Sequence, residues 1–486
     1  MLLEAVVAAF VASQICYFVV SCGLVGLFAR RPLNVVDERT LGRVLEESRT
    51  DSAAGPQQMR AAGDQHLAAK LTPTVDGQYL AAEPTPPVED GPGPDCRLPA
   101  TAQRRIHVLV PVSGSRGEAL EETLASIARQ SYPVGRISVS VISGSGEPAV
   151  AELTDAIEAG RASGLQVVPV ETDGEARAAD QTATERARSD YVESRTEAAT
   201  VADAFATLSF ADDDVVTVVN SGTRLPVDAF ELAVAGLEEY DIVQAKRTAG
   251  NVDDGLLPLL ESAGCAIRSD LLFANSNAGP YRLLEEGYFL TGSVLADLER
   301  WRRDDATGSM ALDVAAFRRG YTLGVLNRYV RSRCPTSVDE WVHEKRRQVS
   351  EPYRRLRAPN WSAFDRLRFV TGTSLPHLLA ITNVIGIPVG LVVVLATAIG
   401  WLSLSGPLIT LVACNAVVWA YYSVRSARAA RQAVALENRW ARLRYSLLSN
   451  PFTQALYTTL WAVPLALAFR DAVSGDESSV SGTPTE

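Results

Sequence analysis

The chain has 486 residues, enough for one large domain with additional segments or for two modest domains. Its hydrophobic share of 47% lies in the globular range, and its net charge of −11 comes from 57 acidic and 46 basic residues. This acidic balance, with no basic face to offset it, argues against a nucleic acid as the partner.

Lysine is rare and occurs only at Lys70, Lys246 and Lys345. An acid-rich, lysine-poor composition is typical of salt-adapted (halophilic) proteins, although GC-rich coding sequence would give the same bias. The 6 cysteines and 4 histidines show no metal-ligand spacing. We expect the cysteines to be small buried side chains in a reducing compartment, and we expect no histidine-based metal site.

The first predicted element is a charge-free apolar run at 6–27, followed by Arg30 and Arg31. A run of this length can cross a bilayer, which needs about 20 residues. A signal peptide is the alternative, but its positive charges should come before the apolar run and not after it. We therefore predict a transmembrane anchor over 1–33.

Residues 34–104 begin polar and become rich in proline and glycine, which predicts a flexible linker with one short helix. The pattern changes at 105, where short apolar runs alternate with segments of helical spacing. The predicted strands are 106–112, 137–142, 165–170, 215–219 and 242–246, and the predicted helices include 117–130 and 149–162. This alternation predicts an α/β domain over 105–350 with a mostly parallel sheet covered on both faces.

A juxtamembrane segment is predicted at 351–380, followed by a transmembrane region at 381–470 and an acidic disordered tail at 471–486. Within that region, apolar runs that predict three spanning helices occupy 381–404, 407–424 and 452–469, and an amphipathic arginine-rich segment occupies 425–447. Fold class is thus α/β plus transmembrane helices, one amino-terminal and about three carboxy-terminal. Arginine placement predicts a multi-pass protein of the cell membrane with the α/β domain in the cytoplasm and the lipid bilayer as a partner.

Four stretches of the middle domain carry the functional pattern. They are HVLVPV at 107–112 with QSYP at 130–133, the strand and turn ending in NSGTRLPVD at 220–228, LD at 312–313 with RRGY at 318–321, and VHEKRRQ at 342–348. In this order and spacing they resemble the family 2 glycosyltransferases, which have the GT-A fold. The resemblance implies transfer of a sugar from a nucleotide-sugar donor, with inversion, to a lipid-linked or surface-glycan acceptor.

The resemblance also assigns roles to residues. It implies donor binding by Pro111, Ser143, Ser145, Asn220, Gly222, Arg346 and Arg347, and acceptor contact by Thr291 and Gly292. Asp313 stands where the family has its catalytic acid, and a carboxylate there could take the proton from the acceptor hydroxyl. An ordinary aspartate at a helix start is the alternative reading.

Three of these sites depart from the family pattern. Ser143 and Ser145 replace an aspartate that holds the base, and Asn220 and Gly222 replace the two aspartates of the Asp-x-Asp motif, which holds Mg²⁺ or Mn²⁺. Without those carboxylates we expect weak metal dependence, with Arg346 and Arg347 as possible diphosphate ligands or as contacts for anionic headgroups. The triplet at 212–214 cannot substitute, because a strand of about five residues separates it from Asn220 by roughly 17 Å.

Two functions therefore remain open from the sequence. The first is a membrane-bound glycosyltransferase that uses Asp313 as its base. The second is a catalytically inactive glycosyltransferase-like protein that scaffolds or regulates a partner, as the replaced aspartates would allow.

Overall fold

The computed structural model describes residues 34–53, 96–99, 102–112, 117–144, 153–172, 207–275, 286–304, 312–346, 439–448 and 450–474, with short pieces between 201 and 205, at 283 and between 390 and 434. The strands are β1 (Val35–Val36), β2 (Ile106–Pro111), β3 (Ile137–Gly144), β4 (Gln166–Thr172), β5 (Val215–Val218), β6 (Ile242–Ala249), β7 (Tyr288–Thr291) and β8 (Leu323–Ser332). The helices are α2 (Glu38–Ala53), α3 (Gly117–Ala128), α4 (Thr154–Ala162), α6 (Ala229–Gly236), α7 (Leu256–Asn275), α8 (Gly292–Asp304), α9 (Leu312–Arg319), α14 (Arg439–Leu448), α15 (Pro451–Leu460) and α16 (Ala462–Ser474), with a 3₁₀ turn at Val134–Arg136.

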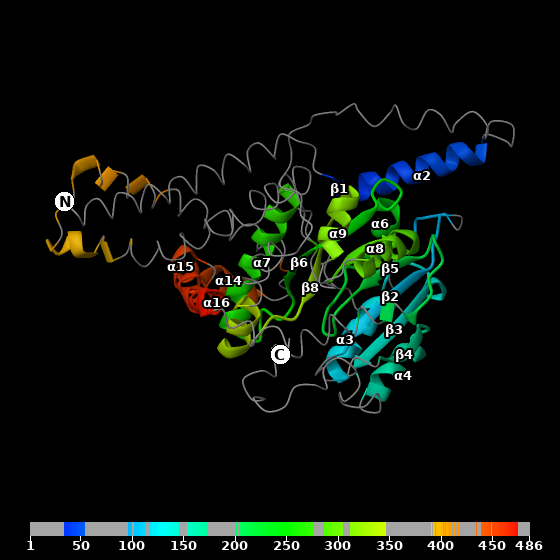
Figure 1. The fold of residues 1–486 in the computed structure, drawn as a ribbon, viewed down its shortest axis with the longest axis horizontal. Coiled ribbons are helices and arrows are strands. Elements are labelled where there is room, and N and C mark those ends of the chain that lie inside the picture. Colours follow the sequence, from blue (N-terminus) through cyan, green and yellow to red (C-terminus); the bar gives the residue numbers. More distant parts are fainter. Residues whose placement is uncertain are drawn as a thin grey trace.

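The strands form one sheet in the order β1-β8-β6-β7-β5-β2-β3-β4 (Figure 1). Strand β7 runs antiparallel to β5 and β6, and the other neighbouring pairs are parallel. The mixed α/β sheet agrees with the α/β domain predicted for 105–350, including the alternation of strands and helices. All strands except β7 therefore end at the same edge of the sheet, which we call the carboxyl edge, and begin at the opposite amino edge.

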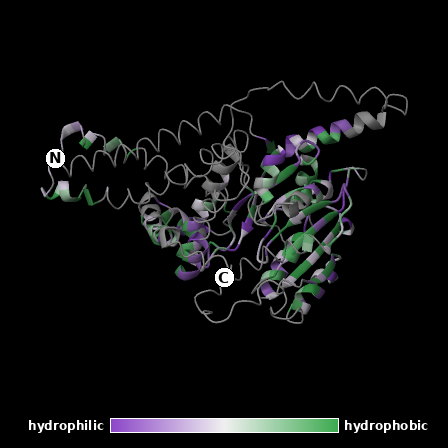
Figure 2. Ribbon diagram, viewed as in Figure 1, coloured by the Kyte–Doolittle hydropathy of each residue, from purple (hydrophilic) through white to green (hydrophobic). Residues whose placement is uncertain are grey.

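Both faces of the sheet are buried, because successive residues of a central strand, such as Val108, Leu109 and Val110, are all fully buried and not only alternate ones. Val108 and Val110 of β2 pack with α3 and α6 in one hydrophobic cluster, whereas Leu109 packs with α8 and α9 in another. Figure 2 shows hydrophobic positions along the strands β2 and β3 and hydrophilic positions along much of α2.

Residues 34–53 were expected to belong to the linker, but they form a strand of the sheet and a helix that packs on it. Strand β1 pairs in parallel with β8, and α2 packs on α6. Val36 and Leu41 are fully or almost fully buried there. The apolar pair before a charged helix is too short to indicate a strand from periodicity alone.

The prediction of membrane-spanning helices in the carboxy-terminal region is wrong. In the described ranges, no helix combines the length and the hydropathy that crossing a bilayer requires. The predicted span at 452–469 is instead divided at Trp461 between α15 of 10 residues and α16 of 13 residues. This finding contradicts the predicted transmembrane helices of the fold class and the predicted multi-pass localisation in the cell membrane.

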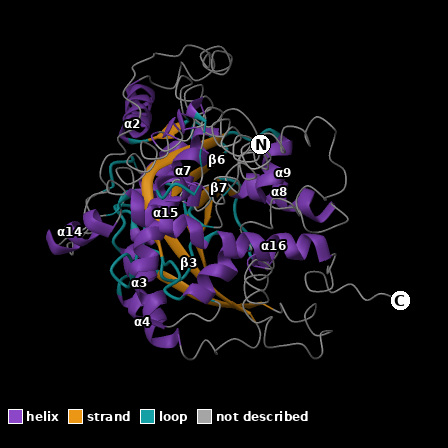
Figure 3. Ribbon diagram, turned by 90° about the vertical axis from the view of Figure 1, so that its left-hand side faces the viewer, coloured by secondary structure: helices purple, strands orange, loops and turns teal. Residues whose placement is uncertain are grey.

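Packing explains why the 452–469 run does not form one helix. Trp461 lies against Trp341 with ring centroids 5.6 Å apart, and Lys345 sits 5.7 Å from the Trp461 ring. Pro464, which has no amide donor, falls in the first turn of the new helix, where none is needed. Tyr457 and Trp461 of this run belong to one hydrophobic cluster with α7 and Trp341, and α15 lies beside α7 in Figures 1 and 3.

The other predicted spans lie mainly or wholly outside the described residues. The run at 6–27 is outside them entirely, and of 381–404 and 407–424 only short pieces are described. One described helical turn ends at Gly400, which has a φ of 77° and is followed by a hydrogen bond from Trp401 N to the Ala396 oxygen at 2.8 Å. The segment 425–447 is described only from 439, apart from 434, and the tail from 475 is not described.

Candidate functional site

Three of the predicted donor residues come together at the carboxyl edge. Strand β2 lies between β3 and β5, with Pro111 paired to Ile142 and Leu109 paired to Val218. Ser143 is the next residue of β3, and Asn220 is two residues beyond Val218, level with Pro111. Ligands of parallel α/β sheets bind beyond this edge, where neighbouring strands lead into loops.

The turn after β5 is fixed by backbone hydrogen bonds. Gly222 donates its N–H toward the Ala119 oxygen at 3.0 Å and toward Thr123 Oγ1 at 2.9 Å, and Thr223 N donates to the Asn220 oxygen at 3.1 Å. Gly222 has a φ of 84°, a conformation that only glycine adopts without strain. The position that carries an acid in the resembled motif is therefore a glycine because the turn needs one here.

The buried carboxylate of Glu286 also fixes the turn after β5. Glu286, immediately before β7, accepts hydrogen bonds from Asn220 N at 3.2 Å and from Thr223 Oγ1 at 2.6 Å, and its second oxygen accepts one from Ser332 Oγ. Its Oε1 also forms an ion pair with Arg247 Nε at 3.3 Å. One side chain thus joins β5, β6, β7 and β8 at the carboxyl edge.

Arg247 is charged beside Glu286. Burial is the largest single influence and acts to lower the pKa of the Arg247 guanidinium, but Glu286 and Glu344 together with other nearby groups outweigh it, and the pKa is raised. The Glu286 side chain is 1% exposed and every oxygen has a partner. This carboxylate is therefore occupied by the protein and is not presented to a ligand.

The end of β8 lies beside the turn. Arg224 and Arg331 form an antiparallel bridge, with reciprocal N-to-O hydrogen bonds of 2.9 and 3.0 Å. Continuing that register by two residues puts Gly222 opposite Arg333, and a Cβ added to Gly222 would lie 3.5 Å from Arg333 Cβ. An exposed arginine therefore adjoins the position of the missing acids.

The residues at this edge do not fit a divalent metal. Asn220 offers a neutral amide, Gly222 offers no side chain, and Glu286 is engaged as described. Within the described ranges, no group of three or more His, Cys, Asp or Glu side chains could hold a metal ion. Mg²⁺ and Mn²⁺ sites normally use at least one or two carboxylates.

Thr291 and Gly292 lie at the opposite edge from Asn220, because β7 runs antiparallel to β5. Gly292 N donates to the Asp214 oxygen at 2.8 Å, and a Cβ at Gly292 would meet the Ala211 oxygen at 2.1 Å. Gly292 therefore allows the backbone at the end of β7 to approach the backbone at Ala211 closely. The structure thus does not bring the predicted acceptor-side residues to the predicted donor residues.

Asp313 is the second residue of α9. Helix α9 packs beside α8 on one face of the sheet. Helix α9 ends at Arg319, and β8 begins at Leu323 at the amino edge. Asp313 is six residues before that helix end, roughly 9 Å at 1.5 Å per residue. Its side chain is outside what the structure describes, as are Ser145 and Arg347.

Arg346 is the last described residue of the helical segment 338–346 and is partly buried. The neighbouring Lys345 is fully buried and donates to Glu261 Oε1 at 2.6 Å, and Trp341 Nε1 donates to Glu261 Oε2 at 3.1 Å. Tyr457 of α15 donates to the same carboxylate. This end of the predicted donor motif therefore anchors the carboxy-terminal helices to α7.

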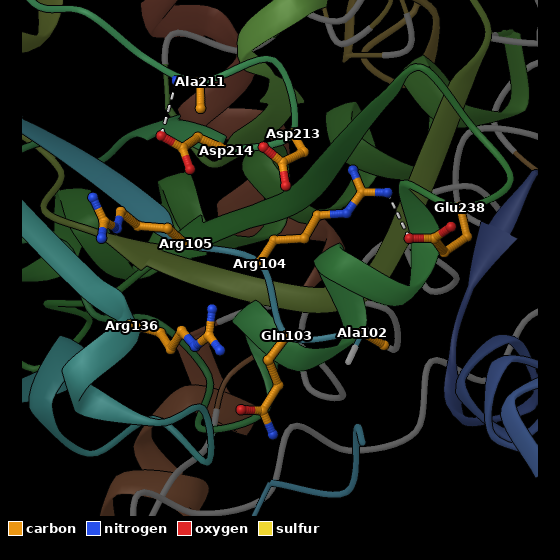
Figure 4. A pocket seen from close by; sticks show the side chains of 9 residues that line it. All are labelled: Ala102, Gln103, Arg104, Arg105, Arg136, Ala211, Asp213, Asp214 and Glu238. Carbon is orange, nitrogen blue, oxygen red and sulfur yellow. Dashed lines mark hydrogen bonds and ion pairs between the residues drawn. The ribbon is translucent and has the colours of Figure 1, made fainter. Parts of the chain in front are cut away.

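A separate groove of about 530 Å³ lies at the amino edge (Figure 4). It is lined by Ala102, Gln103, Arg104, Arg105, Arg136, Ala211, Asp213, Asp214 and Glu238. Asp214 accepts hydrogen bonds from Ala211 N at 3.0 Å and pairs with His107 Nε2 at 2.9 Å, and Arg104 pairs with Glu238 at 2.6 Å. The acidic triplet at 212–214 is thus at the edge away from Asn220, as strand length predicts.

Sequence reasoning missed Glu286, Arg247 and Arg333. Glu286 precedes a glycine and a short apolar strand, a signal shared by many surface turns. Arg247 and Arg333 become informative only through the pairing of β6 and β8 with the turn after β5, which no local pattern indicates.

No protein-family model matches the chain, and no curated protein matches it. Among solved structures it is similar to the mannosyltransferase PcManGT from Pyrobaculum calidifontis in complex with GDP-Man and Mn²⁺, at 15% identity and a TM-score of 0.46, over 96% of this chain and 100% of that one. It is also similar to S. aureus TarS, at 15% identity and a TM-score of 0.32, over 56% of this chain and 43% of that one. TarS 1–349 in complex with UDP-GlcNAc gives 13% identity and a TM-score of 0.33, over 76% and 92% of the two chains. At these scores the likenesses are distant.

Proposed function

We propose that the protein transfers a sugar from a nucleotide-sugar donor to a hydroxyl group of a glycan or a lipid-linked saccharide. One observation carries the proposal: Pro111, Ser143 and Asn220, which are far apart in the sequence, lie at the ends of three adjacent parallel strands at the carboxyl edge. This is the edge at which parallel α/β sheets bind their ligands.

In this function the loops after β2 and β3 hold the nucleotide, and the turn at 220–222 lies against the diphosphate. Asp313 is the proposed general base. It takes the proton of the acceptor hydroxyl while the acceptor oxygen bonds to the anomeric carbon. The bond from that carbon to the diphosphate oxygen breaks at the same time, its electron pair leaves with the nucleoside diphosphate, and the configuration is inverted.

The donor loops would act mainly by positioning. Holding two reactants in line accounts for much of the rate in such transfers, and it requires a rigid edge. The contacts of Glu286 with Asn220, Thr223 and Ser332 supply that rigidity to the turn. Arg346 and Arg347 stay predicted ligands of the diphosphate.

A second function is favoured by one specific observation, namely that the two acids of the resembled metal motif are absent. A glycosyltransferase-like protein without turnover could bind a nucleotide or a partner and regulate another enzyme. The two proposals differ in one outcome, the release of sugar from a donor.

The test is turnover of a panel of UDP- and GDP-sugars, followed as nucleoside diphosphate release, in the parent and in Asp313→Asn. The amide keeps the size of the carboxylate but cannot accept the proton, so we expect a loss of roughly 10²- to 10⁴-fold. Donor affinity should stay the same, and Asp155→Asn is the matched control, because Asp155 is likewise the second residue of its helix, α4. Equal turnover in Asp313→Asn would refute the base assignment, and no turnover in the parent with intact donor binding would favour the second function.

A further inference from the structure

The turn after β5 lacks metal ligands but still lies where the donor diphosphate is proposed to bind. A diphosphate leaving group needs positive charge, which a divalent metal or cationic side chains can provide. Asn220 and Gly222 supply none, and Glu286 is saturated by its contacts to the turn and to Arg247. The charge must then come from the cations that the fold brings to this edge.

Several cationic side chains of the carboxyl edge are already committed. Arg224 pairs with Glu122 at 2.6 Å, and Arg247 pairs with Glu286 at 3.3 Å. Arg331 also has a partner. The guanidinium groups of Arg224 and Arg247 are thus paired with carboxylates of the protein.

Arg333 differs from them in environment. It is exposed, and no hydrogen bond or ion pair of its side chain is recorded within the described ranges. Its guanidinium group can therefore meet an anionic ligand without first breaking an ion pair described in the structure.

The geometry explains where Arg333 would act. The bridge between Arg224 and Arg331 aligns Arg333 with Gly222, and its Cβ and Cδ would lie 3.5 and 3.7 Å from a Cβ at that glycine. The side-chain stem therefore runs across the residue that replaces the second acid of the motif. The absence of a side chain at Gly222 leaves room for this stem beside the turn.

We propose that Arg333 binds the donor diphosphate in place of a divalent metal. This inference rests on the proposed function and specifies the chemistry of the same site. A guanidinium group matches phosphate oxygens in a bidentate manner and is always charged, so it can neutralise the leaving group without a metal. Chelation should then leave donor binding intact.

The experiment is calorimetric titration of UDP and GDP into the full chain, with EDTA and separately with Mg²⁺ or Mn²⁺. The parent should bind one nucleotide with equal affinity in all buffers. Arg333→Gln should weaken that binding roughly 10- to 100-fold, the range for losing a hydrogen bond to a charged group. Affinity for the corresponding nucleoside, which has no phosphate, should not change.

Arg105→Gln is the matched control, because Arg105 is an equally exposed arginine at the opposite edge of the sheet. Its nucleotide affinity should equal that of the parent, and Arg333→Lys should restore part of the loss. Binding that disappears in EDTA and returns with metal would overturn the inference but leave the proposed function standing. Unchanged affinity in Arg333→Gln would also overturn it. A parent that binds neither nucleotide in any buffer would reject the proposed function together with the inference.

Discussion

Glu286 fixes the turn after β5 through contacts made by a single carboxylate. One carboxylate oxygen accepts hydrogen bonds from Asn220 N and Thr223 Oγ1. The other accepts a hydrogen bond from Ser332 Oγ and forms the ion pair with Arg247. Such a carboxylate is stabilising only while its partners are complete, since an unpaired buried charge is costly.

Replacing Glu286 by glutamine should therefore destabilise the protein by about 3 kcal/mol, the low end for breaking a buried pair, because Arg247 retains 20% exposure. Urea unfolding followed by circular dichroism measures this change. Glu122→Gln removes the partner of Arg224 in an exposed pair, 45% and 40% accessible, and should cost less than about 1 kcal/mol. Equal costs for the two variants would show that the Glu286 network is not a buried ion pair in solution.

At the scale of elements, a second polar network ties the segment before residue 104 to the sheet. Arg328 of β8 is 4% exposed and donates to both oxygens of Asp228, with Nη2 to Oδ2 at 2.7 Å. The same Nη2 lies 3.0 Å from Glu38 of α2, and Arg97 pairs with Glu38 and Glu231. Helix α2 is thus held by charge as well as by the burial of Leu41.

Arg328→Met should leave Asp228 buried without its partner and lower the free energy of unfolding by about 3–5 kcal/mol. Limited proteolysis should then cut first within α2, because its anchor is lost. Arg43→Met is the control, as Arg43 also joins α2 to the core through Glu239 but is 59% exposed. A variant of Arg328 as stable as that of Arg43 would contradict the anchoring role of the network.

Local pattern predicted the elements that are long or strongly periodic, such as β2, α3, β3 and α4. It did not predict β1 and α2, because two valines and a polar helix reveal their burial only when β8 is in place. The turn at 220–222 was located correctly at the end of a strand, whereas Glu286 and Arg333 depend on pairings between residues far apart in sequence.

At the scale of the whole molecule, apolar composition misled the prediction for the carboxy-terminal part. Within the run at 452–469, Tyr457 and Trp461 belong to the hydrophobic cluster around α7 and Trp341, and hydropathy alone does not distinguish such packing from contact with lipid. The predicted salt adaptation concerns composition and stays a prediction. Strands β2 to β6 followed from the alternation of strands and helices, whereas β1, β8 and the antiparallel direction of β7 did not.

The central claim is that a nucleotide sugar binds at the carboxyl edge, and hydrogen–deuterium exchange of the full chain with and without a mixture of UDP- and GDP-sugars tests it most directly. We expect slower exchange in peptides that contain Ser143 and the turn at 220–224, with no change around 102–105 and 211–214. Those latter peptides line the amino-edge groove and serve as an internal control. Protection confined to the amino edge, or no protection at either edge, would contradict the account.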